Sequence, residues 1–401
     1  MLYKDRKSKE KVVECYPTNL ISGLKDGLPS TYIPYFHDDK ILRKMQYRQL
    51  GNTNMFVSKV SLGCGPIGGN FGKLESLTSE LIATALLNGI NLIDTGYWYG
   101  QTRSEQILGK ALRYFPRKSY FLSVVVGRFE LDFARAFDYR ADTILHSLTR
   151  SLKRLRLPYA DICFLQIHDT EFELHKRVLL NETLPALKMA QRSGRIRHIG
   201  LVGYSLRKLA YVLEKSPVNI DVIMTFCRGT LNDNTLGEFS KIFESKGIGI
   251  INASPLSMGL LTTQGPPLWH PALQAVKDTC ATAARYCTDK KVALEKLALH
   301  YAVNFPGIST CCVGMASTEQ VLQAVQISQT DKLTETEQRV QDRLLRRYFD
   351  RLQNASWEGL DVDQYWKHLK ELGLTSLGTT RTLSVESVSS RLTTFSCRYP
   401  L

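Results

Sequence analysis

The sequence lacks any apolar run near the roughly 20 residues that a membrane-spanning helix needs. Residues 1–7 are polar and have no signal-peptide apolar core. The 9 cysteines include no C-x-x-C pair, and Cys163, Cys311 and Cys312 lie in strand-like apolar runs that predict buried thiols. We therefore expect a cytosolic protein with no membrane contact, no disulfide framework and no metal site.

The chain also lacks a continuous basic stripe, although its formal net charge is +14. Its basic residues are spread over helices, and two short clusters, at residues 153–156 and 343–347, lie on amphipathic stretches. A solvated helix face explains such clusters more simply than a nucleic-acid site. We therefore expect no nucleic-acid partner, although a basic surface would attract an anionic cofactor.

What the sequence does contain is an alternation of short apolar runs and amphipathic stretches, after a polar lead-in over residues 1–45. A hairpin is predicted over residues 47–58, and we expect it to plug one end of the following domain. Strands are predicted at residues 60–64, 90–94, 120–126, 161–168, 196–202, 220–226, 248–253 and 309–314. Helices are predicted at residues 77–87, 104–113 (with Ser104 as N-cap), 141–155, 182–192, 206–215, 236–244, 271–288, 293–303 and 318–327.

This order predicts an α/β fold, a closed (β/α)8 TIM barrel with an N-terminal hairpin and a C-terminal helical extension. The alternative is an open doubly wound sheet, which usually has a Gly-rich phosphate turn after its first strand. Residues 63–68 superficially match that turn, but Pro66 breaks the helix start that the motif needs.

The domain organisation follows from this pattern. We assign residues 1–45 to an N-terminal extension and residues 46–370 to the barrel domain. Within that domain a long helix over residues 333–352 follows the barrel, and residues 354–361 are expected to fold back over it. Residues 371–401 form a Ser/Thr-rich tail whose composition predicts disorder.

Functional groups of such a barrel collect at the C-terminal ends of its strands. Asp94 and Tyr99 follow the second strand, and His168 ends the fourth. Each alone is more often an ordinary strand-end or core residue, but a carboxylate, a phenol and an imidazole at one rim suit proton transfer. Residues 254–261 follow the seventh strand, and residues 314–317 open a helix whose N–H groups could hold a phosphate.

These motifs resemble those of the aldo-keto reductase family, from about residue 47 to residue 366. The resemblance rests on residues 47–51, Ile93-Asp94-Thr95 with Tyr99-Gly100, residues 104–109, residues 165–169 and residues 254–256. Residues 199–204, 230–233, 252–261 and 265–271 are most similar to the branch of L-galactose and D-threo-aldose 1-dehydrogenases.

The resemblance implies hydride transfer between NADP or NAD and a small sugar or carbonyl compound, by a chain that is commonly a monomer. It implies that Tyr99 exchanges a proton with the substrate oxygen, that His168 orients that oxygen, and that Asp94 belongs to the same hydrogen-bonded set. The residues implied to bind the cofactor are Ser254, Pro255, Leu256, Gly259, Leu260, Gly314, Met315, Ala316, Gln320 and Gln323.

The chain departs from the family at the lysine that normally completes this set, whose position we assign to Val126. Without an ammonium, Tyr99 loses the charge that would lower its pKa from the usual value of about 10. Arg128 is common in the family and need not replace that lysine. Residues 322–324 also lack the acidic residue and the asparagine that usually contact the adenosine. Two hypotheses follow: a weakened oxidoreductase, or an inactive scaffold or ligand sensor.

Overall fold

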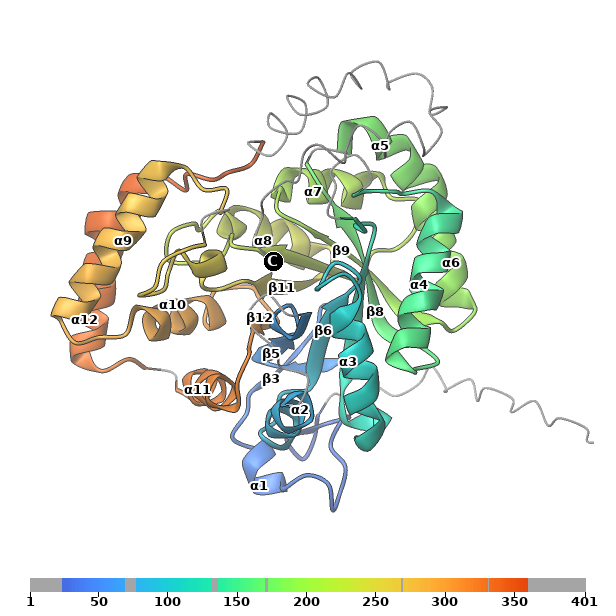
Figure 1. Ribbon diagram of the computed structural model, residues 1–401, viewed down its shortest axis with the longest axis horizontal. Coiled ribbons are helices and arrows are strands. Elements are labelled where there is room, and N and C mark those ends of the chain that lie inside the picture. Colours follow the sequence, from blue (N-terminus) through green and yellow to red (C-terminus); the bar gives the residue numbers. More distant parts are fainter. Residues whose placement is uncertain are drawn as a thin grey trace, which may run out of the picture.

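Eight parallel strands close into a barrel in the computed structural model, which describes residues 24–68, 77–130, 136–169, 172–267, 270–330 and 332–359 (Figure 1). Each strand pairs with the next along the chain, and the last, β12, pairs with the first, β5. The predicted (β/α)8 barrel is therefore confirmed, and the open-sheet alternative is wrong. The predicted tail at residues 371–401 lies outside the described residues.

The barrel strands fall close to the predicted runs. They are β5 Val60–Gly63, β6 Leu92–Gly96, β7 Phe121–Val126, β8 Ala160–Ile167, β9 Ile196–Gly203, β10 Val222–Phe226, β11 Gly249–Ala253 and β12 Thr310–Gly314. Alternate side chains point into the barrel and toward the surrounding helices, so both faces are buried. This explains why the strands are nearly continuous apolar runs.

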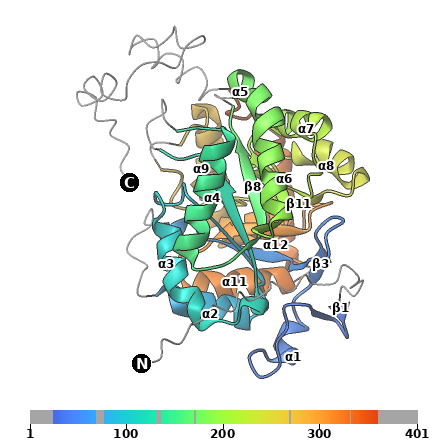
Figure 2. The ribbon, with the colours of Figure 1, turned by 90° about the vertical axis from the view of Figure 1, so that its right-hand side faces the viewer.

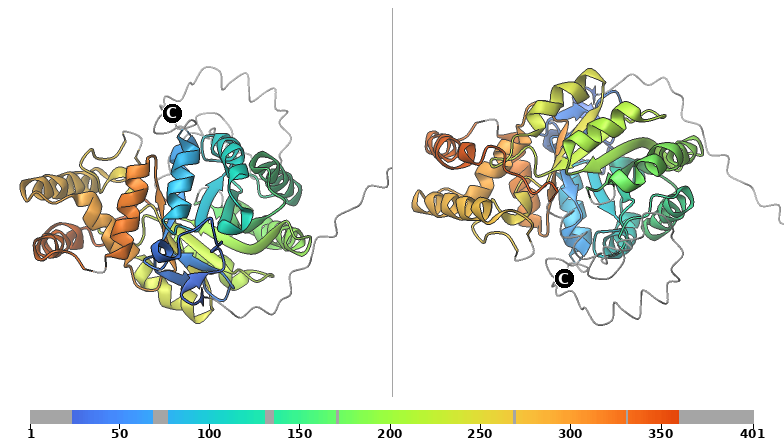
Figure 3. Two further views of the ribbon diagram at one scale, coloured as in Figure 1. Left: turned by 90° about the horizontal axis from the view of Figure 1, so that it is seen from below. Right: turned by 90° about the horizontal axis from the view of Figure 1, so that it is seen from above.

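The helices surround the barrel in chain order. They are α2 Thr78–Leu87, α3 Arg103–Ala111, α4 Ala141–Leu155, α5 Phe172–Val178, α6 Leu184–Arg192, α7 Leu206–Lys215, α8 Leu236–Ser245, α9 Gln274–Asp289, α10 Leu294–Val303, α11 Thr318–Gln329 and α12 Glu335–Leu344. Short π and 3-10 turns, η6 Leu345–Phe349 and η7 Asp350–Leu352, continue α12 to the predicted end of the long helix. Both views of Figure 3 show α9 and α12 side by side at the edge of the barrel, where they share an apolar cluster.

The N-terminal hairpin consists of β3 Tyr47–Gln49 and β4 Phe56–Ser58. Leu50, Met55 and Val57, within or beside it, belong to the cluster of side chains inside the barrel, so the predicted plug is confirmed. The described part of the lead-in also forms elements that the sequence did not predict: β1 Leu24–Lys25, β2 Leu28–Pro29 and α1 Asp39–Leu42. They lie beside the hairpin at one end of the barrel (Figure 2).

Two local predictions need correction. Ser104 is not the N-cap of α3, because the helix begins after Thr102, whose φ is 77°. Ser104 is buried within the first turn instead, and its hydroxyl donates to the Cys64 carbonyl at 2.9 Å. The second correction concerns α5, a short helix that the sequence pattern did not predict.

The predicted buried thiols are confirmed among the described residues, where seven cysteines are free and buried. Within the same ranges, no helix combines the length and apolar content that crossing a membrane requires.

Candidate active site

The centre of the site is a hydrogen-bonded carboxylate at the end of β6. Asp94 is 3% exposed and points into the barrel. Its Oδ2 accepts from the Tyr99 hydroxyl at 2.7 Å, and its Oδ1 accepts from the Ser123 hydroxyl at 2.5 Å. Ser123 is the neighbour of Asp94 on β7, so strand pairing itself places this donor. The structure therefore brings Asp94 and Tyr99 together and adds Ser123, which the sequence analysis missed.

The environment of this pair shifts both pKa values upward. Burial raises the pKa of Asp94 to about 6, although the hydroxyl groups of Ser123 and Tyr99 act in the opposite direction. Burial and the neighbouring Asp94 carboxylate raise the pKa of the Tyr99 phenol well above its ordinary value. At neutral pH Tyr99 is therefore protonated and donates to an ionised Asp94.

The assignment of the family lysine position to Val126 is wrong, because that side chain faces away from the site. Val126 belongs to the cluster between the strands and the helices, whereas Val125 belongs to the cluster inside the barrel. Because side chains alternate along a strand, Val125 lies on the same face of β7 as Ser123. The position facing Asp94 and Tyr99 is therefore Val125, and it is apolar too.

The imidazole predicted for the site follows β8 on the same rim. The ring of His168 packs against Phe137, with centroids 4.5 Å apart. Burial, together with the charges of Arg128 and Lys208, lowers the pKa of His168 well below its ordinary value. His168 is therefore neutral at physiological pH and can orient a substrate oxygen without carrying a charge.

Arg128 interacts both with the loop after β6 and with His168. Its guanidinium lies over the ring of Trp98, 3.6 Å from the centroid, and Trp98 precedes Tyr99 on the loop after β6. Stacking of this kind stabilises the loop by about 1 kcal/mol. Arg128 therefore positions the loop that carries the phenol, and its charge acts on His168.

The loop after β11, residues 254–261, is held at the mouth of the barrel by polar contacts. The Ser254 N–H donates to the Cys312 carbonyl at 3.1 Å, and the Ser257 hydroxyl donates to Asn232 Oδ1 at 2.7 Å. His270 Nε2 lies 3.1 Å from the Ser257 carbonyl. The Nδ2 atom of Asn232 is buried without a partner within the described part of the chain. The mouth therefore keeps a donor that a bound cofactor could use.

The end of β12 carries the second group of residues that the sequence predicts to bind the cofactor. Gly314 is exposed there, and Met315 is buried beside it. Ser317 caps α11 by accepting from the Gln320 N–H at 3.3 Å, and Gln320 Oε1 accepts from the Ala316 N–H at 2.7 Å. A phosphate at this turn would displace the Gln320 side chain from Ala316.

The first turns of α11 contain the residues at which the sequence predicts no acidic contact to the adenosine. Ala324 is buried beneath the helix, and Leu322 presents an exposed apolar side chain. Gln323 is the exposed polar group between them. At residues 322–324 the exposed side chains are therefore one apolar group and one neutral amide, and the exposed acid of this helix start is Glu319 instead.

A buried arginine fastens the C-terminal segment over the ends of β9 and β10. Arg228 pairs with Asp233 at 2.9 Å and with Glu358 at 2.5 Å. The adjacent Trp357 stacks on Tyr204, with centroids 4.8 Å apart. The expectation that residues 354–361 fold back over the barrel is confirmed for residues 354–359.

We expect Arg228→Met to lower the free energy of unfolding by about 3 kcal/mol, because Asp233 is 1% exposed and would be left without its cation. Urea denaturation followed by circular dichroism measures this change. The control is Arg339→Met, which removes an ion pair with Glu335 whose side chains are 72% and 81% exposed, and should cost less than about 1 kcal/mol. Equal effects in the two variants would contradict the assignment of a stabilising role to Arg228.

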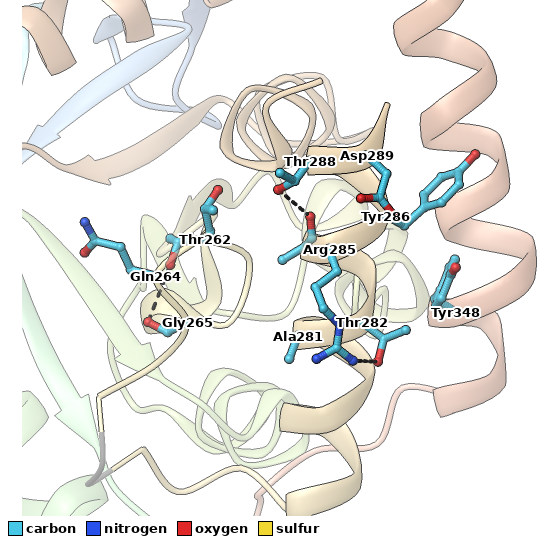
Figure 4. Close-up of a pocket in the computed structure, with 12 residues that line it drawn as sticks. Thr262, Gln264, Gly265, Ala281, Thr282, Arg285, Tyr286, Thr288, Asp289 and Tyr348 are labelled. Carbon is cyan, nitrogen blue, oxygen red and sulfur yellow. Dashed lines mark hydrogen bonds between the residues drawn. The ribbon is translucent and has the colours of Figure 1, made fainter. Parts of the chain in front are cut away.

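A separate surface cavity of about 630 Å³ lies between residues 262–265, α9 and η6 (Figure 4). Its walls are partly polar and partly apolar, and they include Arg285 and Tyr286 from α9 and Tyr348 from η6. It contains none of the predicted catalytic residues and is therefore not the reaction site.

A closed (β/α)8 barrel with a carboxylate–phenol pair at its rim is the arrangement of an oxidoreductase of the aldo-keto reductase class. The chain belongs to the Aldo/keto reductase family, whose family model matches residues 60–346.

Two characterised relatives are sugar dehydrogenases. The chain is 40% identical over 284 residues to the L-galactose dehydrogenase of Arabidopsis thaliana, covering 70% of this chain and 87% of that protein. It is 33% identical over 261 residues to the D-arabinose 1-dehydrogenase of Saccharomyces cerevisiae, covering 62% of this chain and 75% of that protein. The chain is also similar to the solved structure of an aldo-keto reductase from Bacillus halodurans in its holo form. The sequence identity is 27% and the TM-score is 0.61, and the match covers 75% of this chain and 96% of that one.

Proposed function

We propose that this chain is an NAD(P)-dependent dehydrogenase that oxidises a small aldose at its anomeric carbon. The observation that carries the proposal is the 2.7 Å hydrogen bond from Tyr99 to the buried carboxylate of Asp94. It gives the phenol a proton acceptor that does not depend on the missing lysine. The two sugar dehydrogenases similar to this chain support an aldose as the substrate class.

The proton chemistry follows from the pair. A bound nicotinamide cofactor supplies the hydride acceptor. Tyr99 accepts the proton of the anomeric hydroxyl while its own proton passes to Asp94, so the phenol need not ionise fully. The neutral imidazole of His168 orients the same hydroxyl. In the reverse direction Tyr99 donates its proton to the carbonyl oxygen, and protonated Asp94 restores it.

The substrate class can be narrowed further. L-Galactose and D-arabinose, the sugars named for the two relatives, have the same configuration at the three carbons that follow the anomeric carbon. We therefore expect the pocket to select an aldose with that configuration. The cofactor would be held by residues 254–260 and 314–320, and the neutral side chains of Leu322 and Gln323 would let NAD and NADP bind with similar affinity.

The test begins with a fluorescence titration of the full chain with NADH and NADPH. Oxidation of L-galactose and D-arabinose is then followed by cofactor absorbance, with the mirror-image sugars D-galactose and L-arabinose as matched controls. Turnover of the first pair with little of the second supports the proposal. No cofactor binding at millimolar concentration refutes it, and binding without turnover favours the inactive scaffold or ligand sensor.

The rate of aldose oxidation should rise with pH through about 6, because only ionised Asp94 can accept the proton that Tyr99 releases. Ser123→Ala removes a hydroxyl that lowers the pKa of Asp94, so the midpoint should move upward by about one unit. Asp94→Asn should abolish the rise of the rate near pH 6. The measurement is kcat/KM between pH 5 and pH 9, and an unchanged midpoint in Ser123→Ala would exclude Asp94 as the titrating group.

A further inference from the structure

A second concave site lies on the outer side of the barrel, between α3 and α4, which run next to each other (Figure 1). It has a volume of about 400 Å³. Gly109 allows the two helices to touch, since a Cβ there would lie 2.0 Å from the Arg154 carbonyl oxygen. The groove is therefore formed by the close packing of two helices. Its lining residues are Gln106, Lys110, Arg150, Lys153, Arg154 and Arg156.

This lining consists of five cationic side chains and one amide. The nearby carboxylate of Glu105 is 0% exposed and pairs with Arg154 at 2.6 Å, so one cation is already neutralised. Arg150, Lys153 and Arg156 make no ion pair with another described residue. Residues 153–156, which the sequence assigned to an ordinary solvated helix face, are thus part of a concave surface with excess positive charge.

We propose that this groove binds a compact polyanion that carries at least two phosphate groups. A concave surface lined by cations concentrates positive potential, and guanidinium groups match phosphate oxygens in pairs. The volume fits a small ligand, whereas nucleic acid needs an extended basic stripe. Such a ligand would lie between the two helices with the side chains of Arg150 and Lys153 beside it.

The groove is separate from the proposed cofactor site. It is formed by α3 and α4, which flank β7, whereas the cofactor turns follow β11 and β12 on another side of the barrel (Figure 1). The inference therefore stands or fails independently of the proposed dehydrogenase activity.

The test is isothermal titration of the full chain with sodium tripolyphosphate at constant ionic strength, with and without saturating NADPH. We expect saturable binding of one ligand per chain that NADPH does not displace. The double variant Arg150→Glu/Lys153→Glu should lower the affinity by about tenfold or more, because two attractive charges become repulsive. Arg154 is left intact, since its loss would leave Glu105 buried without a cation.

The matched control is Arg207→Glu/Lys241→Glu, which makes the same change of net charge on the exposed faces of α7 and α8. The affinity of this control variant for tripolyphosphate should stay within about twofold of wild type, because the changed charges are screened from the groove. Equal losses in both variants, displacement by NADPH or the absence of saturable binding would overturn the proposal. So would tighter binding of a single-stranded oligonucleotide or of phosphatidylserine vesicles than of tripolyphosphate.

Discussion

Replacing Tyr99 with phenylalanine will lower kcat for aldose oxidation by about 10²–10⁴-fold, the usual contribution of a positioned acid–base group. The hydroxyl is the link between the substrate oxygen and Asp94, 2.7 Å away, and no path for the proton remains without it. The aromatic ring is retained, so the loop after β6 keeps its packing. Steady-state kinetics with L-galactose and fluorescence titration with NADPH separate the loss of chemistry from any loss of cofactor binding.

Tyr97→Phe is the control for this substitution, because Tyr97 lies on the same loop and its ring packs against Phe129 instead of pointing to Asp94. We expect its kcat to stay within about threefold of wild type, since it takes no part in proton transfer. If Tyr99→Phe keeps more than about a tenth of the wild-type kcat, another group carries the proton, and the Tyr99–Asp94 relay is wrong.

The barrel could be predicted because each strand and helix has its own local pattern. Strand-length apolar runs alternate with amphipathic stretches, and the carboxyl ends of the strands then share one rim. The sequence pattern alone therefore predicts that Asp94, Tyr99 and His168 lie at one end of the barrel. The parts that depend on contacts distant in sequence were not predictable. Arg228 and Glu358 are 130 positions apart, and neither has a pattern that points to the other.

The basic groove between α3 and α4 is a second feature that the sequence alone could not predict. Residues 153–156 read as a solvated face when α4 is considered alone. Lys110 and Gln106 complete the groove from α3, and the contact that creates it depends on Gly109. A charge cluster becomes a candidate site only when packing adds a second wall, and a helical pattern does not contain that information.

The local error on β7 has a simple physical origin. Side chains alternate between the two faces of a strand, so a shift of one position exchanges the barrel interior for the helix layer. All positions from Phe121 to Val126 are buried, so the usual polar and apolar alternation is absent and does not mark the faces. The informative residue was Ser123, the single hydroxyl in this apolar strand, which marks the inner face by its bond to Asp94.

We expect Val125→Lys to raise kcat for aldose oxidation by about tenfold or more at pH 7. An ammonium on the inner face of β7 would lie near Asp94 and Tyr99 and lower both pKa values. The pH midpoint near 6 should move downward accordingly, which measures the new charge independently of the rate. The lysine is tolerable there because Val125 is near the rim, 6% exposed, with a carboxylate on the neighbouring strand.

Val126→Lys tests the same idea by placing the same charge one residue further along the strand. Val126 is 0% exposed among apolar side chains, so the substitution should lower the free energy of unfolding by at least about 3 kcal/mol without raising kcat. Urea denaturation and the pH profile of kcat/KM distinguish the two variants. A gain of activity in Val126→Lys would restore the original assignment. If neither variant gains activity while wild type turns over, Asp94 already accepts the proton that Tyr99 passes on during the reaction, and the site needs no ammonium group on β7.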